Sequence, residues 1–295
     1  MKKFLIYLSG ILLLVLALLF ILDFFYTSIY NKANPRTKYQ YLKSLKNSKV
    51  NYVFLGSSRV DNGIVPKLIE NVTNLKTVNL GFQGSKMGDI YFVLELLHAY
   101  NIEYDTVFIQ VDYNFNDNGC SINLPYQMAP FFKDNEITKN YLIDYVGKSS
   151  FYYFPFFRYC ENESKIGVRE LFANLINKKT SVRTTKGYSA LQDLENHKES
   201  HRVLPEYIVN RNQYYEKIKQ FGNDHNLNIV FFCAPFCKHT RNLNYIKRLK
   251  VKIPNLHDFS NVIQDDKMFV NCYHLNNDGA FYFSELFCTK ILKNR

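Results

Sequence analysis

A long apolar run stands near the start of the chain. Residues 4–22 are nineteen positions without a charge, and two lysines precede them. A run of this length is sufficient for one helix across the hydrocarbon layer of a membrane. The apolar character resumes after Asp23, and the small residues typical of a signal-peptide cleavage site are missing, so we predict an uncleaved membrane anchor over residues 1–30.

The pattern of apolar positions changes after the anchor. Residues 31–50 are polar and lysine-rich, and we interpret them as a linker with a short helix over residues 39–45. Short runs of β-branched and aromatic residues then follow, and they are continuous rather than alternating. Continuous runs are typical of strands buried on both faces of a parallel sheet. The runs cover residues 51–56, 75–80, 106–111 and 228–234.

Segments of helical periodicity separate these runs. They cover residues 65–70, 89–100, 205–225 and 279–292. Strands that alternate with helices predict an α/β fold with a doubly wound parallel sheet, in which functional loops lie at the carboxyl ends of the strands.

Residues from about 116 to 204 interrupt the alternation. They contain an aromatic block, residues 151–159, among polar and helix-like segments. Because a structureless loop of this length is uncommon in a compact domain, we predict an inserted subdomain within one α/β domain over residues 51–295. We interpret the aromatic block first as subdomain core, with sugar stacking or membrane contact as the alternatives.

Charge and cysteine usage narrow the possible partners. Lys and Arg number 37 against 26 Asp and Glu, a formal net charge of +11. The positive charges form no basic run, so we predict no nucleic-acid partner, and charge alone leaves the membrane orientation open.

Six cysteines suit disulfides in an exported domain but show no paired metal spacing. Cys233 and Cys237, at the end of a predicted strand, are at least as suited to buried free thiols as to a bridge, and Cys272 is interpreted as a packing residue.

Two motifs carry candidate chemistry. A buried strand delivers the tripeptide Gly56-Ser57-Ser58 to its carboxyl end, ahead of a helix. Far along the chain, His274 stands in a loop before the last helix, and a doubly wound sheet brings its last loop beside its first. A serine beside a histidine is the arrangement that activates a hydroxyl for nucleophilic attack. Each motif alone is more often a capped turn or a satisfied polar residue.

Together the two motifs resemble those of the SGNH (GDSL-like) hydrolase superfamily. The strand-terminal Gly-x-Ser and the His-Leu-Asn-x-x-Gly-Ala sequence from His274 carry the resemblance, which covers about residues 51–119 and 205–292. It implies a flavodoxin-like, three-layer α/β fold. It also makes Ser58 the nucleophile and His274 the general base, with no metal or organic cofactor.

The resemblance also assigns an oxyanion hole. The first donor would be the backbone N–H of Ser58, and the second would be the N–H of a glycine after the second strand, Gly81 with Gly84 as a rival. The Asn114 side chain would supply the third donor. The third family block lacks its usual glycine here. The last block, normally Asp-x-x-His, begins with Asn271 in place of the aspartate.

An asparagine before the histidine changes the chemistry that we expect. An amide can hydrogen-bond a ring nitrogen, but it adds no negative charge to stabilise an imidazolium. Three outcomes remain open: Asn271 orients His274 for a slow or specialised transfer, another carboxylate replaces the aspartate, or the protein does not catalyse. The candidate carboxylates are Asp265, Asp266 and Asp278.

The anchor and the Gly-Ser-Ser-Arg sequence narrow the resemblance to membrane-tethered SGNH-like proteins that work beside membrane-bound O-acyltransferases on bacterial cell-surface glycans. This resemblance implies a cell-membrane protein with a periplasmic or extracellular domain, whose Ser58 forms an acyl-enzyme with acyl, first of all acetyl, esters. Arg59 would bind an anionic glycan, or pair structurally with Asp61 or Asp112. A catalytically silent binding or scaffold subunit of a surface-polysaccharide assembly is the alternative, and an unrelated domain with a coincidental serine and histidine is a third.

Overall fold

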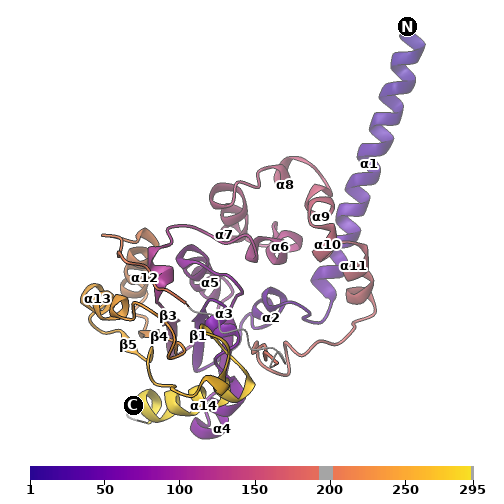
Figure 1. Ribbon diagram of the computed structural model, residues 1–295. Coiled ribbons are helices and arrows are strands. Elements are labelled where there is room, and N and C mark those ends of the chain that lie inside the picture. Colours follow the sequence, from indigo (N-terminus) through magenta and orange to yellow (C-terminus); the bar gives the residue numbers. More distant parts are fainter. Residues whose placement is uncertain (193–201, 294–295) are drawn as a thin grey trace. The chain divides into compact units, whose positions relative to one another are not determined.

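The computed structural model describes residues 1–192 and 202–293 (Figure 1). The chain divides into two compact units. Unit 1 comprises Met1–Gln40 and Pro125–Thr180, and unit 2 comprises Tyr41–Leu124 and Ser181–Arg295. This division differs from the expected one, because the expected linker contributes to both units and only the middle of the expected insertion belongs to unit 1. Part of that insertion, residues 193–201, lies outside the described residues.

Unit 2 is built on a five-stranded parallel sheet in the order β2-β1-β3-β4-β5. The prediction of an α/β fold with a parallel sheet is confirmed, and four of the strands lie within two residues of their predicted bounds. In a sheet of this order, the crevice between β1 and β3 opens at the carboxyl ends of the strands. The strands are β1 (Tyr52–Gly56), β2 (Thr77–Gly81), β3 (Thr106–Gln110), β4 (Ile229–Cys233) and β5 (His257–Asp258).

Helices cover the sheet of unit 2 on both faces (Figure 1). On one face, α4 (Pro66–Thr73) and α14 (Asn277–Phe287) pack together over an aromatic core. Phe54 and Phe108 stack in this core with ring centroids 4.7 Å apart, and Phe287 meets both rings edge-on. On the other face, α5 (Met87–Ala99) contacts β1 and α12 (Gln213–Asp224) packs against α5.

Several elements of unit 2 differ from the prediction. Helix α12 begins at Gln213 rather than at residue 205, because the Asn212 side chain caps it by accepting the N–H groups of two residues in its first turn. Helix α13 (Asn244–Lys252) was not predicted. Neither was the antiparallel hairpin of β6 (Phe269–Asn271) and β7 (His274–Leu275). The remaining short elements are α3 (Ser58–Asp61), η1 (Tyr113–Asn116), η4 (Asp266–Met268) and η5 (Cys288–Leu292).

Unit 1 is entirely helical in its described residues. Its longest element is α1 (Lys2–Lys32), and α2 (Lys38–Ser44), the predicted short helix, contains the boundary between the units. The other elements are short: α6 (Leu124–Met128), η2 (Ala129–Phe131), α7 (Glu136–Asn140), η3 (Tyr141–Tyr145), α8 (Ser150–Tyr153), α9 (Phe157–Glu161), α10 (Glu163–Ile166) and α11 (Val168–Leu175).

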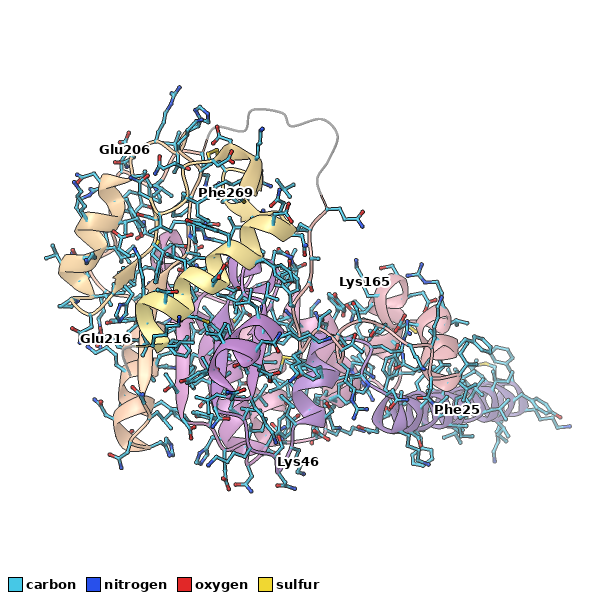
Figure 2. The ribbon with its side chains drawn as sticks, turned by 90° about the horizontal axis from the view of Figure 1, so that it is seen from below. Phe25, Lys46, Lys165, Glu206, Glu216 and Phe269 are labelled. Carbon is cyan, nitrogen blue, oxygen red and sulfur yellow. A yellow bond between two sulfur atoms is a disulfide. The ribbon has the colours of Figure 1, made fainter. Side chains whose placement is uncertain are left out.

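Helix α1 is long and apolar enough to cross a membrane. Most of its large apolar side chains are exposed as far as Phe25, and they project outward along the helix (Figure 2). Tyr26 and Tyr30, in the last two turns of the helix, are buried instead. The 31 residues of the helix exceed the roughly 20 that a membrane span requires. The C-terminal part of the helix, beyond the length of a membrane span, packs within unit 1.

A buried ion pair holds α1 in unit 1. Asp23 pairs with Arg158, which lies 135 positions further along the chain. The Asp23 carboxylate also accepts the N–H of Phe156 at 2.8 Å, and Arg158 donates to the Thr27 hydroxyl at 2.7 Å. These further hydrogen bonds offset part of the cost of burying the charge pair.

Candidate functional site

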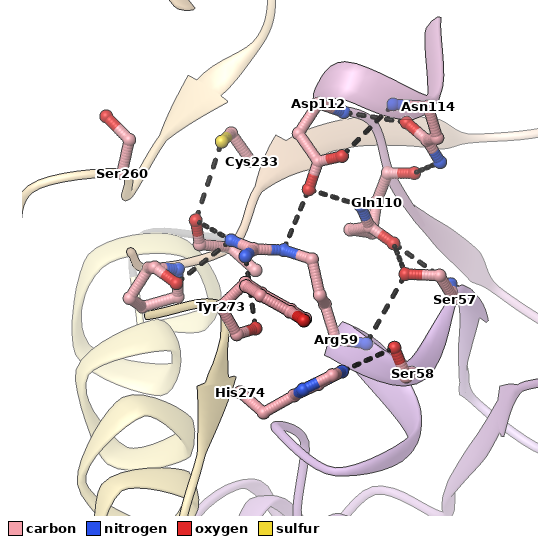
Figure 3. Close-up of polar contacts among 12 residues, drawn as sticks. Ser57, Ser58, Arg59, Gln110, Asp112, Asn114, Cys233, Ser260, Tyr273 and His274 are labelled. Carbon is pink, nitrogen blue, oxygen red and sulfur yellow. Dashed lines mark hydrogen bonds and ion pairs between the residues drawn. The ribbon is translucent and has the colours of Figure 1, made fainter. Parts of the chain in front are cut away.

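Ser58 and His274 meet at the carboxyl edge of the sheet of unit 2. Ser58 is the first residue of α3, directly after β1, and His274 begins β7. The imidazole Nε2 lies 2.7 Å from the Ser58 hydroxyl oxygen, although the two residues are 216 positions apart (Figure 3). Both are partly exposed. This distance excludes the interpretation in which the serine and the histidine lie at opposite ends of the sheet.

Ser57, the neighbour of Ser58, has a structural role. Its N–H and its hydroxyl both donate to the Gln110 side-chain oxygen at 2.9 Å, and the serine is buried. A Cβ at Gly56 would lie 2.8 Å from the Gln110 Cβ, so only glycine allows this close approach. Sequence reasoning missed Gln110, although a polar residue that ends a buried apolar strand was an available signal.

Arg59 is the best-satisfied charge of the site. Its Nε lies 2.8 Å from the Asp112 carboxylate, and its Nη1 donates to the Tyr273 carbonyl at 3.1 Å. Its Nη2 donates to two successive carbonyls after β4, those of Ala234 at 2.7 Å and Pro235 at 2.9 Å. The guanidinium therefore joins the ends of β3 and β4 to the residue before His274.

The surroundings of Arg59 leave it no exposed surface for a substrate. The residue is 3% exposed, and its guanidinium also lies 3.7 Å from the Phe236 ring centroid. Of the two roles considered for Arg59, substrate binding and pairing with Asp61 or Asp112, the structure has the pair with Asp112. Burial raises the pKa of Asp112, and the Arg59 charge opposes that rise.

Asn271 closes the hairpin that carries His274. Its side-chain oxygen accepts the backbone N–H of Tyr273 at 3.2 Å and that of His274 at 3.0 Å. The amide thus fixes the backbone of His274 rather than its ring. Among the described residues, no hydrogen-bond partner of the His274 Nδ1 is found.

The carboxylates considered as replacements are engaged elsewhere. Asp266 pairs with Lys238 at 2.7 Å and with the His239 ring at 3.1 Å. Asp265 caps η4, and Asp278 lies in the first turn of α14. Within the described part of the chain, none of the three hydrogen-bonds His274.

The protonation state of His274 follows from these surroundings. Burial lowers the pKa of His274 to about 4, and the positive charges of Arg59 and Arg202 act in the same direction. Asp61 opposes them and is the one carboxylate among the causes. The imidazole is therefore neutral near pH 7, the state in which its Nε2 can accept the Ser58 proton.

Two of the three expected oxyanion-hole donors are engaged by the protein. The Gly81 N–H donates to the Asn79 side chain at 3.0 Å, and the Asn114 amide donates to the Gln110 carbonyl at 3.4 Å. By contrast, no hydrogen bond of the Ser58 or Gly84 N–H occurs among the described residues. The rival glycine considered from the sequence, Gly84, thus retains the more available donor.

A disulfide between Cys237 and Cys272 lies next to the site. It joins the loop after β4 to the turn of the hairpin, two residues before His274, and the Cys237 N–H also donates to the Cys272 carbonyl at 3.1 Å. The interpretation of Cys272 as a packing residue is therefore wrong, and Cys237 forms a bridge rather than a thiol. Over residues 1–192 and 202–293, no group of three or more His, Cys, Asp or Glu residues suited to a metal is found.

No protein-family model matches the chain, and no curated protein matches it.

The buried Arg59 predicts a large effect of its removal. Arg59→Met leaves the Asp112 carboxylate buried without its counter-charge, so we expect the free energy of unfolding to fall by roughly 3–5 kcal/mol. Denaturant-induced unfolding of the full chain in mild detergent measures the change. Lys238→Met removes an exposed partner of Asp266 and is the matched control, with little change expected. Equal stability of the two variants would contradict the structural role of Arg59.

Proposed function

We propose that the protein is a membrane-anchored, SGNH-like serine esterase or O-acyltransferase that acts on acyl esters of cell-surface glycans. The observation that carries the proposal is the 2.7 Å contact between His274 Nε2 and the Ser58 hydroxyl. The contact lies at the carboxyl edge of a parallel sheet, where such folds hold their ligands. A hydroxyl within hydrogen-bond reach of an imidazole is the arrangement of a nucleophile and its general base.

The proposed reaction is a two-step acyl transfer. His274 takes the Ser58 proton while the hydroxyl oxygen attacks the acyl carbon of an ester, and the tetrahedral intermediate then collapses. The alcohol leaves with the proton from His274, and Ser58 keeps the acyl group. Water then attacks the acyl-enzyme in an esterase, or a sugar hydroxyl does so in a transferase, and this second step needs no metal or organic cofactor.

Two backbone groups are suited to stabilise the oxyanion of that intermediate. The Ser58 N–H lies at the start of α3, where the first N–H groups of a helix have no partner within the helix. The Gly84 N–H follows β2, at the neighbouring strand end. The Ser58 donor is the one expected from the sequence, and we propose Gly84 in place of Gly81 and Asn114, whose groups bond within the protein.

The missing carboxylate favours the second candidate function, a catalytically silent binding or scaffold subunit. A Ser-His pair without its acid retains only part of its catalysis in known triads. The absence of a described partner at the His274 Nδ1 and the low pKa of the ring both weaken it as a base. The two functions differ in whether Ser58 reacts, which a chemical probe can detect.

The proposed location is a cell membrane, with α1 as a single anchor and unit 2 in the periplasm or outside the cell. The disulfide between Cys237 and Cys272 supports this side of the membrane, since disulfides persist in oxidising compartments. The proposed partner is a membrane-bound O-acyltransferase that exchanges acyl groups with this protein. That partner and the glycan substrate rest on the family resemblance.

Reaction with a fluorophosphonate probe tests the proposed nucleophile. We expect the full chain in detergent to be labelled, and expect Ser58→Ala and His274→Ala to lose labelling, because the hydroxyl and its base are then missing. Ser57→Ala is the matched control and keeps labelling, since Ser57 faces Gln110. Absence of labelling in every folded variant would favour the scaffold function, and labelling of Ser58→Ala would exclude Ser58 as the nucleophile.

The pKa of His274 predicts the pH dependence of this labelling. Below its pKa the imidazole is protonated and cannot accept the Ser58 proton, so the rate should fall on acidification with a midpoint near pH 4. Asn271→Asp adds a negative charge to the same hairpin, which should raise both the midpoint and the rate. Rates of probe labelling across pH measure both effects. A wild-type midpoint near the ordinary histidine value of about 6.5 would contradict the buried, neutral imidazole.

A further inference from the structure

A second arginine of the site, Arg202, is held differently from Arg59. Its guanidinium carbon lies 4.6 Å from the Tyr113 ring centroid and 5.1 Å from the Tyr273 ring centroid. The Tyr273 ring in turn lies 4.6 Å from the His274 imidazole. The Arg202 backbone is fixed as well, because its carbonyl accepts the Arg241 N–H at 2.7 Å. A positive charge is thus positioned beside the Ser58–His274 pair by two aromatic rings and a backbone hydrogen bond.

No salt-bridge partner of Arg202 is found in the described part of the chain. The Asp112 carboxylate is near enough for the Arg202 charge to oppose the rise of its pKa, but that carboxylate pairs with Arg59 at 2.8 Å. By contrast, the guanidinium of Arg59, the residue after Ser58, contacts a carboxylate and three carbonyls. A guanidinium that stacks on aromatic rings and forms no salt bridge keeps its N–H groups for an anionic ligand.

We propose that Arg202 binds an anionic group, a carboxylate or a phosphate, of the substrate acted on by Ser58. This inference rests on the proposed function and names a class of substrate for it. Stacking on the rings of Tyr113 and Tyr273 fixes the guanidinium and leaves its N–H edges for the ligand. The planar fork of arginine matches the two oxygens of a carboxylate or phosphate, which a lysine cannot reproduce.

Binding of an anion at Arg202 has a consequence for the base. Arg202 is one of the two positive charges that lower the pKa of His274. A bound anion offsets that charge and makes the imidazole a stronger base while the substrate is present. The substrate then supplies part of the negative charge that Asn271 does not.

Calorimetric titration of the full chain in detergent tests this anion site without relying on catalysis. Glucuronate and inorganic phosphate are the probes, and glucose is the neutral comparison. We expect both anions to bind and glucose not to bind, with affinity falling roughly tenfold or more in Arg202→Gln and less in Arg202→Lys. Arg241→Gln, an exposed arginine beside Arg202 in space, is the matched control and should bind as the wild type does.

Fluorophosphonate labelling of the same variants separates this inference from the proposed function. Labelled Arg202→Gln with unchanged anion affinity overturns the anion site and leaves the nucleophile in place. An unlabelled wild type whose anion binding depends on Arg202 overturns the esterase or transferase and keeps the site. A rise in the midpoint pH of wild-type labelling on addition of phosphate, absent in Arg202→Gln, would support the coupling to His274.

Unit 1 carries a separate feature, an exposed aromatic cluster that consists of Tyr152, Tyr153, Phe154 and Phe157. These side chains are 55%, 71%, 60% and 41% exposed. The two tyrosine rings lie 5.3 Å apart and the two phenylalanine rings 6.2 Å apart. Contiguous exposed apolar side chains mark a surface that contacts a protein, a ligand or a membrane.

The aromatic cluster is fixed beside α1. Phe156, between its members in sequence, donates its N–H to Asp23 at 2.8 Å and meets the Tyr26 ring edge-on at 4.9 Å. Asp23 is the residue at which the uncharged stretch of α1 ends. The aromatic cluster therefore lies in the same unit as α1, next to the point at which α1 changes from exposed to buried.

We infer that the aromatic cluster lies in the interfacial layer of the membrane that α1 crosses, in contact with lipid. The helix begins at Lys2, so the part of it before Asp23 is about 32 Å long, close to the roughly 30 Å thickness of the hydrocarbon layer. Asp23 and Arg158 then lie at the end of that layer. Tyrosine is enriched at this depth, where its ring is in the apolar region and its hydroxyl is near water. This inference does not depend on the proposed function.

The absence of tryptophan from the sequence gives a direct test. The full chain with Phe154→Trp, reconstituted in phosphatidylcholine vesicles, carries a single fluorescent reporter in the aromatic cluster. We expect brominated lipid chains to quench its emission strongly and aqueous acrylamide to quench it weakly. Tyr207→Trp, at a position of unit 2 that is 68% exposed, is the matched control for acrylamide quenching of an exposed ring. Strong acrylamide quenching of Phe154→Trp without quenching by bromine would overturn the inference.

Discussion

The buried guanidinium of Arg59 is the interaction on which the candidate site depends. It lies one residue after Ser58, and it contacts the end of β3, the loop after β4 and the residue before His274. These segments are far apart in the sequence. Because a buried charge without hydrogen-bond partners costs much free energy, all of the segments must stay in place to supply those partners. The 2.7 Å contact between Ser58 and His274 is therefore held by a neighbouring charge rather than by a carboxylate on the histidine.

The sheet could be predicted because its strands leave a strong local pattern. Strands β1, β2 and β3 are buried along their whole length, so each appears as a continuous apolar run. Strand β5 has two residues, both exposed, and carries no such pattern. The division into units was not predictable for a different reason. The contact of Asp23 with Arg158 spans 135 positions, and local periodicity does not show which distant segments pack together.

The site was predictable in part, since residue types at a given spacing do not reveal where their polar groups point. The meeting of Ser58 and His274 followed from the topology of a doubly wound sheet. Two of the expected oxyanion donors, Gly81 and Asn114, carry suitable groups that are directed into the protein. Arg202 had no local signal, because its position depends on two tyrosine rings from other parts of the chain.

The disulfide between Cys237 and Cys272 makes the restraint of the site depend on the redox conditions of the compartment. It closes a loop of 35 positions, and closure of a loop of that size stabilises a fold by roughly 3–4 kcal/mol in the chain-entropy account. In a reducing compartment the bond does not form, and the hairpin that carries His274 loses one of its covalent restraints. With unit 2 outside the cytoplasm, as proposed, the disulfide would form only after export of the newly made chain. His274 would therefore be fully restrained only then, and Ser58 would become reactive only where the protein meets its substrate.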